Sequence, residues 1–270
     1  MEVTHLYKWR SLSKAFENLS SNLKKMPALA ISTCDEKVLE EILITRRKDP
    51  DPSNPIHPLK KIKIWVTVTK RATFEMINEL LQTNNINLEN LSLSLGALDA
   101  QILSSLRFNA LTILNLERTT RIALQTLLLG TPVLKFLTLK KCAFTDDTKT
   151  LLLNSQSLNT INLLRCDLTP FATILIQIAN LHILTWDNII LNNDLKLVIN
   201  AENIDTLVYK GILVETSFHV LTIGESFIVI QDLSPLSPTK FAHDLNKMMN
   251  GLRGSMIMKM DATTAQVYSL

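Results

Sequence analysis

The chain has 270 residues, of which 46% are hydrophobic and 20% are charged, and its formal net charge is +3. This composition excludes a wholly disordered chain, and so small a net charge excludes a polycation that holds nucleic acid by bulk charge. No uncharged apolar stretch reaches the roughly 18 residues of a transmembrane helix, so we expect no membrane partner. The N-terminus carries no secretory pattern, and three widely spaced cysteines favour a reducing compartment, the cytoplasm or the nucleus.

The first element that the pattern predicts is a helix over residues 34–48. Thr33 and Glu36 form a capping-box pattern, and four apolar residues follow at helical spacing. Residues 49–58 contain four prolines and predict an extended linker or an ordered crossing loop. We expect residues 21–58, which hold this helix and linker, to cap the first repeat and to cover an otherwise open sheet edge.

A Leu-x-x-Leu-x-Leu triplet, with Ile or an aromatic residue allowed, recurs from residue 59 onward. Its copies are Leu59/Ile62/Ile64, Leu88/Leu91/Leu93, Leu111/Leu114/Leu116, Leu134/Leu137/Leu139, Leu158/Ile161/Leu163, Leu181/Leu184/Trp186 and Ile204/Leu207/Tyr209. From Leu88 onward, the copies start 23, 23, 24, 23 and 23 residues apart. This period predicts an α/β leucine-rich-repeat solenoid over residues 59–270, with parallel strands on its concave face and short helices and turns on its convex face.

Between the triplets, short apolar stretches predict helices. The three candidates are Ala72–Gln82, Ile122–Leu129 and Thr148–Leu153. The repeat phase becomes irregular over residues 218–230. Beyond it we predict a helix over Phe241–Met249 and a degenerate last triplet at Leu252, Ser255 and Ile257.

Cys142 and Cys166 both stand eight residues after a triplet start. One interpretation is a metal or redox pair. The other is a buried turn residue that fills a fixed slot of the repeat, and this one explains both residues at once. We therefore predict two structural cysteines.

The sequence contains no recognisable catalytic pattern. The five histidines form no His-Glu-x-x-His, and neither Cys-x-x-Cys, Gly-x-Ser-x-Gly nor a Walker loop is present. We therefore expect a protein that is not an enzyme and has no cofactor and no metal site.

In a repeat of this kind, the residues two, four and six after each triplet start point to the concave face. One interpretation of this face is an ordinary solvent-facing sheet. The other interpretation is a protein-binding groove with Phe136 and Leu164 as anchors. It is favoured because apolar side chains expected to be exposed there stand among small polar ones. The candidate binding residues are Ile113, Asn115, Glu117, Phe136, Thr138, Lys140, Asn162, Leu164, Thr185, Asp187 and Lys210.

Three segments of the chain resemble a known family. Residues 134–142 followed by Phe144 look like the repeat of the plant F-box/leucine-rich-repeat proteins. Residues 195–211 are similar to a segment near the end of their repeats, where a Leu-x-Tyr-x-Gly strand follows an Ala-x-Asn-like step. Residues 7–12 resemble the close of the F-box, with a Trp-Arg pair at Trp9, so that residues 1–20 are expected to be an F-box remnant.

The resemblance implies a substrate receptor of an SCF-type ubiquitin ligase, in which the repeats bind a protein substrate and the F-box binds a cullin-adaptor subunit. Only eight residues precede Trp9 in this sequence, so we expect most of the F-box to be missing, and adaptor binding is left open. The competing class is a freestanding leucine-rich-repeat scaffold or recognition protein with no ubiquitin-ligase link. A third class is a nucleic-acid binder that uses the basic residues 1–70, which hold 13 Lys or Arg against 8 Asp or Glu. We disfavour it because no basic run is interleaved with aromatic residues.

Overall fold

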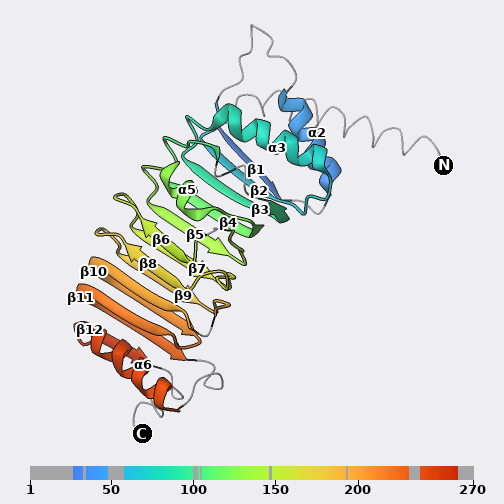
Figure 1. The fold of residues 1–270 in the computed structure, drawn as a ribbon. Coiled ribbons are helices and arrows are strands. Elements are labelled where there is room, and N and C mark those ends of the chain that lie inside the picture. Colours follow the sequence, from blue (N-terminus) through green and yellow to red (C-terminus); the bar gives the residue numbers. More distant parts are fainter. Residues whose placement is uncertain are drawn as a thin grey trace, which may run out of the picture.

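The computed structural model describes residues 27–32, 35–47, 58–99, 103, 105–145, 148–192, 194–230 and 238–260. In these residues the strands stack in chain order along one axis, from one end of the molecule to the other (Figure 1). Every pair of neighbouring strands is parallel. The molecule is therefore a solenoid of parallel strands, as the repeat period predicts.

The main sheet, which we call the front sheet, has the strand order β1-β2-β3-β4-β5-β7-β9-β10-β11-β12. We call its solvent side the front face. The strands are β1 Ala28–Ser32, β2 Lys61–Trp65, β3 Asn90–Asp99, β4 Ile113–Thr120, β5 Phe136–Lys140, β7 Thr160–Leu164, β9 Ile183–Asp187, β10 Lys196–Gly211, β11 Glu215–Ile230 and β12 Ser255–Met260. Six of them, β2 to β5 with β7 and β9, begin two residues after a triplet start, which confirms the strands predicted there.

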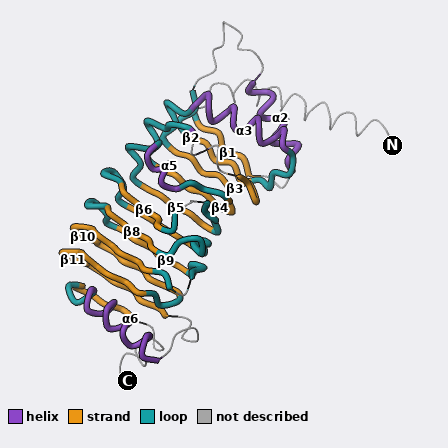
Figure 2. Tube along the Cα trace, viewed as in Figure 1, coloured by secondary structure: helices purple, strands orange, loops and turns teal. Residues whose placement is uncertain are grey.

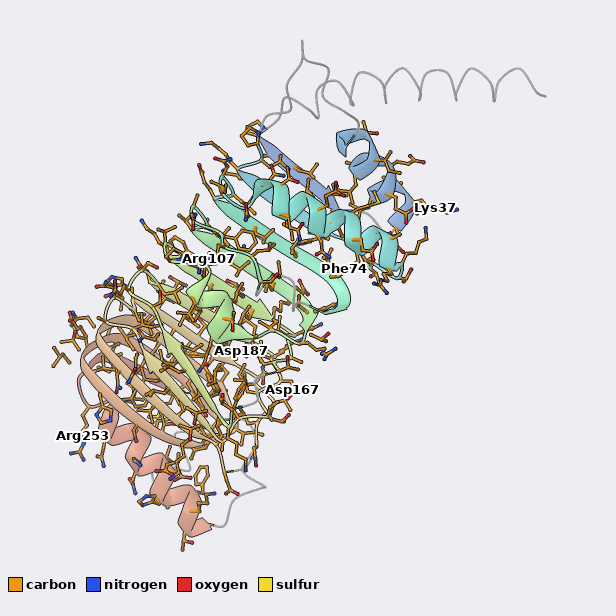
Figure 3. All side chains as sticks on the ribbon, turned by 45° about the horizontal axis from the view of Figure 1, so that its top comes forward. Lys37, Phe74, Arg107, Asp167, Asp187 and Arg253 are labelled. Atoms are coloured by element: carbon orange, nitrogen blue, oxygen red, sulfur yellow. The ribbon has the colours of Figure 1, made fainter. Side chains whose placement is uncertain are left out.

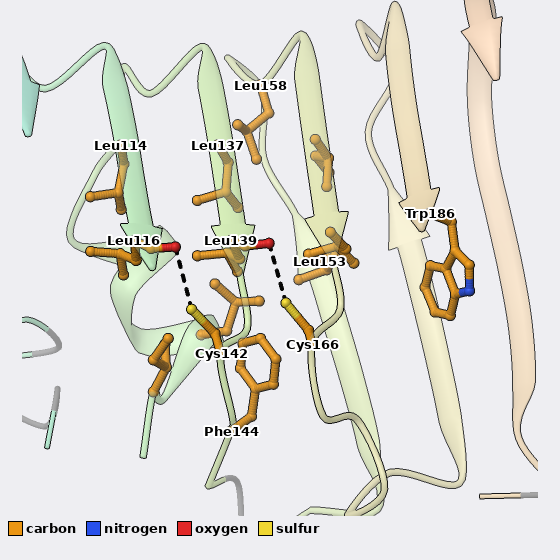
Figure 4. Packing of buried hydrophobic residues seen from close by; sticks show 14 of the residues in the cluster. Leu114, Leu116, Leu137, Leu139, Cys142, Phe144, Leu153, Leu158, Cys166 and Trp186 are labelled. Carbon is orange, nitrogen blue, oxygen red and sulfur yellow. Dashed lines mark hydrogen bonds between the residues drawn. The ribbon is translucent and has the colours of Figure 1, made fainter. Parts of the chain in front are cut away.

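The second and third residues of each triplet form the core. Leu114 and Leu116 of β4 lie beside Leu137 and Leu139 of β5, and all four are buried (Figure 4). Burying one such side chain contributes about 1.5–3 kcal/mol, and no repeat can do so alone. Stability therefore comes from stacking one repeat on the next.

Cys142 and Cys166 are buried turn residues, as predicted. The Cys142 thiol donates to the carbonyl oxygen of Leu116 at 3.4 Å, and the Cys166 thiol donates to that of Leu139 at 3.2 Å (Figure 4). Each sulfur thus bonds the carbonyl of the third triplet residue in the preceding repeat. The same contact in two successive repeats explains why cysteine recurs at this position.

The inner side of the front sheet is covered by helices near both ends of the molecule and by strands between them (Figure 2). Helices α2 Glu36–Arg47, α3 Arg71–Asn84 and α5 Leu124–Leu129 belong to the N-terminal half. In the C-terminal half, β6 Thr150–Asn154 pairs with β8 Thr173–Gln177, and β8 pairs with the first part of β10. Helix α6, Pro238–Gly251, packs on β11. The helices predicted over residues 72–82 and 241–249 lie within α3 and α6.

The helix predicted over Thr148–Leu153 is wrong, because strand β6 occupies this segment. Leu151 and Leu153 are buried while the intervening Leu152 is half-buried, an alternation with the period of a strand. The backbone of β6 pairs with β8 over all five residues, whereas so short a helix would be only marginally stable. The back of the solenoid therefore changes from helix to strand at this repeat.

We expected the helix of residues 34–48 to follow directly on the edge of the first predicted strand, Lys61–Trp65, but a further strand pairs with this edge. Strand β1 pairs with β2 at this edge, with Leu29 and Ile31 buried, so the front sheet begins at Ala28 and not at residue 59. Helix α2 follows β1 and lies beside α3 (Figure 1). A strand this short, with only two inward apolar residues, carries too weak a pattern to be predicted.

The C-terminal segment continues the sheet. Residues 218–230, which look irregular in the repeat phase, belong to the long strand β11, and β11 pairs with β10 from Lys196 to Gly211. The predicted last triplet places Ile257 in the core, but Ile257 pairs with Glu225 and is exposed. The residues that pack on the core are Met258 and Met260. The 23-residue period is lost here because paired residues of β10 and β11 stand 19 positions apart, whereas those of β11 and β12 stand 32 apart with α6 between the two strands.

Candidate functional site

The front face brings together the eleven predicted binding residues. Strand pairing aligns them, with Thr160 and Ile183, in three columns that cross β4, β5, β7, β9 and β10. The columns are Ile113, Phe136, Thr160 and Ile183; Asn115, Thr138, Asn162 and Thr185; and Glu117, Lys140, Leu164, Asp187 and Lys210. A constant period predicts this alignment, because residues at equal repeat positions pair across parallel strands.

The first column carries the exposed apolar side chains. Phe136 is 44% exposed and Ile183 is 38% exposed, whereas Thr160 between them is only 8% exposed. Ile113 is half-buried. Phe136 and Ile183 therefore stand on either side of a low point formed by Thr160, a shape that can seat an apolar side chain of a partner.

The middle column is polar, and hydrogen bonds join its residues between repeats. The Asn115 side-chain amide donates to Ser92 Oγ at 3.0 Å, and that of Asn162 donates to Thr138 Oγ1 at 3.3 Å. These bonds hold two amides in place, one on β4 and one on β7, with β5 between them. Fixed amides lose little side-chain entropy when they bind a peptide group, so this column is suited to polar recognition.

The third column is charged at both ends and apolar in the middle. Lys140 Nζ lies 3.1 Å from a Glu117 carboxylate oxygen, and Asp187 accepts a 2.7 Å hydrogen bond from the Asn188 amide. Leu164 lies between Lys140 and Asp187 and is half-buried. Leu164 is therefore less exposed than Phe136 and Ile183, which are the two exposed apolar residues of the three columns.

Two further aromatic residues lie on the front face outside the predicted set. Trp65 of β2 is 44% exposed, and Lys63 Nζ stands 4.1 Å from its ring centroid. Phe227 of β11 is exposed, with Lys210 Nζ 5.3 Å from its ring centroid. Extending the columns to the triplet at Leu59 finds Trp65, but no sequence signal finds Phe227, because β11 lies outside the regular period.

One backbone conformation repeats directly after the last paired residue of β4, β5, β7 and β9, and we call these four positions the turn ladder. Arg118, Lys141, Arg165 and Asn188 have φ angles of 54°, 53°, 54° and 52°, and each stands seven residues after a triplet start. Successive turns are joined by backbone bonds: the Lys141 amide donates to the Leu164 carbonyl, and the Arg165 amide donates to that of Asp187. These turns define the edge of the front face beside the charged column, and Asp167 and Asp187 are labelled near it in Figure 3.

Within the part of the chain that the structure describes, no group of three or more His, Cys, Asp or Glu side chains could hold a metal ion. His182 Nδ1 lies 3.0 Å from Asp205 Oδ2, but this pair is exposed and joins two neighbouring repeats. No helix among the described residues is long and apolar enough to cross a membrane. The chemistry that the front face offers is recognition by apolar, amide and charged side chains.

Comparison with known proteins gives no relative: no family model matches the chain, and neither a curated protein nor a solved structure does.

Proposed function

We propose that the chain is a non-enzymatic module that binds another protein on its front face. The observation that carries this proposal is the pair of exposed apolar side chains, Phe136 and Ile183, on either side of the buried Thr160. Large apolar side chains exposed close together on one face of a sheet are typical of interaction surfaces. The fixed amides of Asn115 and Asn162 lie in the adjacent column and supply the polar groups of such an interface.

We further propose that the repeats are leucine-rich repeats and that they derive from an F-box substrate receptor. The period of 23 or 24 residues and the triplet pattern support the first part. The second part rests on the resemblance of residues 7–12, 134–144 and 195–211 to the plant family. Residues 7–12 lie outside the described residues.

The front face is tested by the change Phe136→Asp. The immobilised chain is exposed to cell extract, and the proteins that it retains are identified by mass spectrometry for the wild type and the variant. Leu129→Asp is the matched control, because Leu129 is 84% exposed on α5, away from the front face. We expect Phe136→Asp to lose a specific partner that the control retains, with both variants folded by circular dichroism. Equal retention by both variants contradicts the proposal.

The ligase relationship is tested by co-expression with the cullin-adaptor subunit and size-exclusion chromatography. Co-elution as a stable complex supports a substrate receptor. Elution of the folded chain apart from the adaptor rejects that role and leaves the competing class, a freestanding recognition protein. This second result does not affect the front-face proposal, which the Phe136→Asp comparison decides.

A further inference from the structure

The turn ladder carries three cations in a row. Arg118, Lys141 and Arg165 occupy the same position of three successive repeats with φ angles within one degree of each other, and all three side chains are exposed. Neighbouring parallel strands lie about 4.8 Å apart, so residues with equal backbone conformation at equal positions project in similar directions. The result is a short ridge of positive charge along the edge of the front face.

The turn itself does not call for these residue types. A φ near +55° is uncommon outside glycine, and asparagine adopts it more readily than arginine or lysine. The next turn of the ladder holds Asn188, a residue type that suits this conformation. A reason other than backbone conformation must therefore account for three basic residues in the preceding turns.

The ridge is also not neutralised within the described part of the chain. Elsewhere on the front sheet, Lys140 forms an ion pair with Glu117, and Lys60 forms one with Glu89. No such ion pair is formed by Arg118, Lys141 or Arg165 among the described residues. Like charges at strand spacing repel one another, and a bound anion would relieve this repulsion.

We propose that Arg118, Lys141 and Arg165 bind an acidic peptide segment of the partner protein, a proposal that rests on the front face being a protein-binding surface. The distance from Arg118 to Arg165 is two strand spacings, about 9.6 Å, which about three residues of extended peptide cover. The segment is therefore a run of three or four Asp or Glu residues laid across the strand ends. An apolar residue at the end of this acidic segment packs on Leu164, which is next to Arg165.

A peptide fits this edge better than a nucleic acid. Glu117 and Asp187 lie one position before the turn residues, so a continuous phosphate backbone would meet carboxylates as well as cations. A peptide can place acidic side chains on the ridge and neutral ones opposite these carboxylates. The neighbouring Leu164 also offers no aromatic ring on which a base could stack.

The test uses the full chain and a fluorescein-labelled hexapeptide with four consecutive Glu residues followed by Leu, measured by fluorescence anisotropy at several salt concentrations. The decisive variant changes Arg118, Lys141 and Arg165 together to Asn. Asparagine suits the left-handed turn, as at Asn188, so this variant should fold; the single change Lys141→Asn is a milder version. The control changes Lys37, Arg107 and Arg253 to Asn, removing equal charge away from the edge (Figure 3).

We expect the wild type to bind the peptide with an affinity that falls as salt rises, and the triple Asn variant to lose about tenfold while the control changes less than twofold. A hexapeptide with Gln in place of Glu should not bind. The proposal is overturned by equal affinity of the triple variant and the wild type, or by tighter binding of a single-stranded oligonucleotide that depends on the same three residues.

Failure of this proposal can be told apart from failure of the front face. If Phe136→Asp abolishes retention of the partner while the triple Asn variant retains it fully, the front face stands and the acidic segment is rejected. If neither variant changes retention, both proposals are rejected.

Discussion

Two thiols in the core serve as hydrogen-bond donors to the backbone. Cys142 and Cys166 are buried among leucine side chains, and each donates to a carbonyl of the preceding repeat. Contact with Cys142 and burial raise the pKa of the Cys166 thiol, which keeps this sulfur protonated at neutral pH. A protonated, buried thiol is a poor nucleophile, so this residue has a structural role and little reactivity.

We expect Cys142 and Cys166 to resist alkylation by iodoacetamide in the native protein and to react only after denaturation. The change Cys34→Ser removes the third thiol and simplifies the measurement by mass spectrometry. Rapid labelling of either residue at pH 8 without denaturant would contradict the buried, bonded state of the two sulfurs.

Glu36 acts between two helices. It is the first residue of α2, but its carboxylate accepts hydrogen bonds from the backbone amides of Thr69 and Lys70 at 3.1 and 2.9 Å, at the start of α3. The predicted capping box with Thr33 falls partly outside the described residues. Partial burial acts to raise the pKa of Glu36, but the bonds from Thr69, Lys70 and Thr73 outweigh it and lower the pKa from 4.5 to about 2.

We predict that Glu36→Gln lowers the stability by about 1 kcal/mol at pH 7, the usual cost of losing a helix-start bond. Because the folded-state pKa is below the unfolded value, the carboxylate contributes fully above pH 4.5, and its contribution is lost as the pH falls toward 2. Urea melts at pH 7 and pH 2.5 should show a difference between variant and wild type that shrinks at the lower pH. Glu41→Gln, on the exposed side of α2, should behave as the wild type at both.

At the scale of elements, α6 closes the C-terminal end of the inner side. Phe241, Leu245 and Met248 are buried against the core, and Lys247 Nζ lies 2.6 Å from Glu215 Oε1 at the start of β11. Asp244 on the same helix is only 3% exposed, and its Oδ2 atom has no hydrogen-bond partner among the described residues. Burial raises the pKa of Asp244, so the charged form destabilises this packing.

We predict that Asp244→Asn raises the melting temperature at pH 7, by an amount equivalent to about 1 kcal/mol. The folded-state pKa of Asp244 lies above its usual 3.8, so the destabilisation is present at neutral pH, decreases as the pH falls through this raised pKa, and is gone below 3.8. Calorimetry at pH 7 and pH 3.5 measures the difference in melting temperature between variant and wild type at each pH. Asp194→Asn, an exposed change, is the control, and an equal gain in both variants would contradict the role of burial.

At the scale of the whole molecule, strand pairing joins each described repeat to the repeats on either side of it. Strands β5 and β7 are paired on both sides, whereas β1 and β12 each pair on one side among the described strands. In such an array the free energy of opening is approximately a sum of repeat and interface terms. The ends therefore open at lower cost than the centre.

We predict a gradient of amide hydrogen exchange along the solenoid, with β1 and β12 exchanging faster than β4, β5 and β7. Mass spectrometry of peptic peptides measures it. Leu137→Ala, which removes a buried side chain of β5, should cost about 2–5 kcal/mol and speed exchange in β4, β5 and β7 before the end strands. Uniform acceleration along the chain would mean that the array unfolds as one unit.

Much of the candidate site follows from the repeat period. Position within the triplet predicts which side chains point inward, and a constant period aligns Phe136 with Thr160 and Lys140 with Leu164 across neighbouring strands. The basic ridge was not predicted from sequence, because no pattern showed that Arg118, Lys141 and Arg165 share a left-handed turn. Phe227 was missed for a different reason, since β11 departs from the period.

The sequence by itself determined the stacking of parallel strands, because each triplet has one apolar face that only a neighbouring repeat can bury. It also determined the columns of the front face, because side chains alternate with period two along a strand. Only the tertiary structure decided what lies behind this sheet. Short apolar segments such as residues 150–154 form a strand or a helix according to the neighbour that pairs with their backbone, and β8 is that neighbour. The edge strand β1 was decided in the same way, by the unpaired backbone groups of β2.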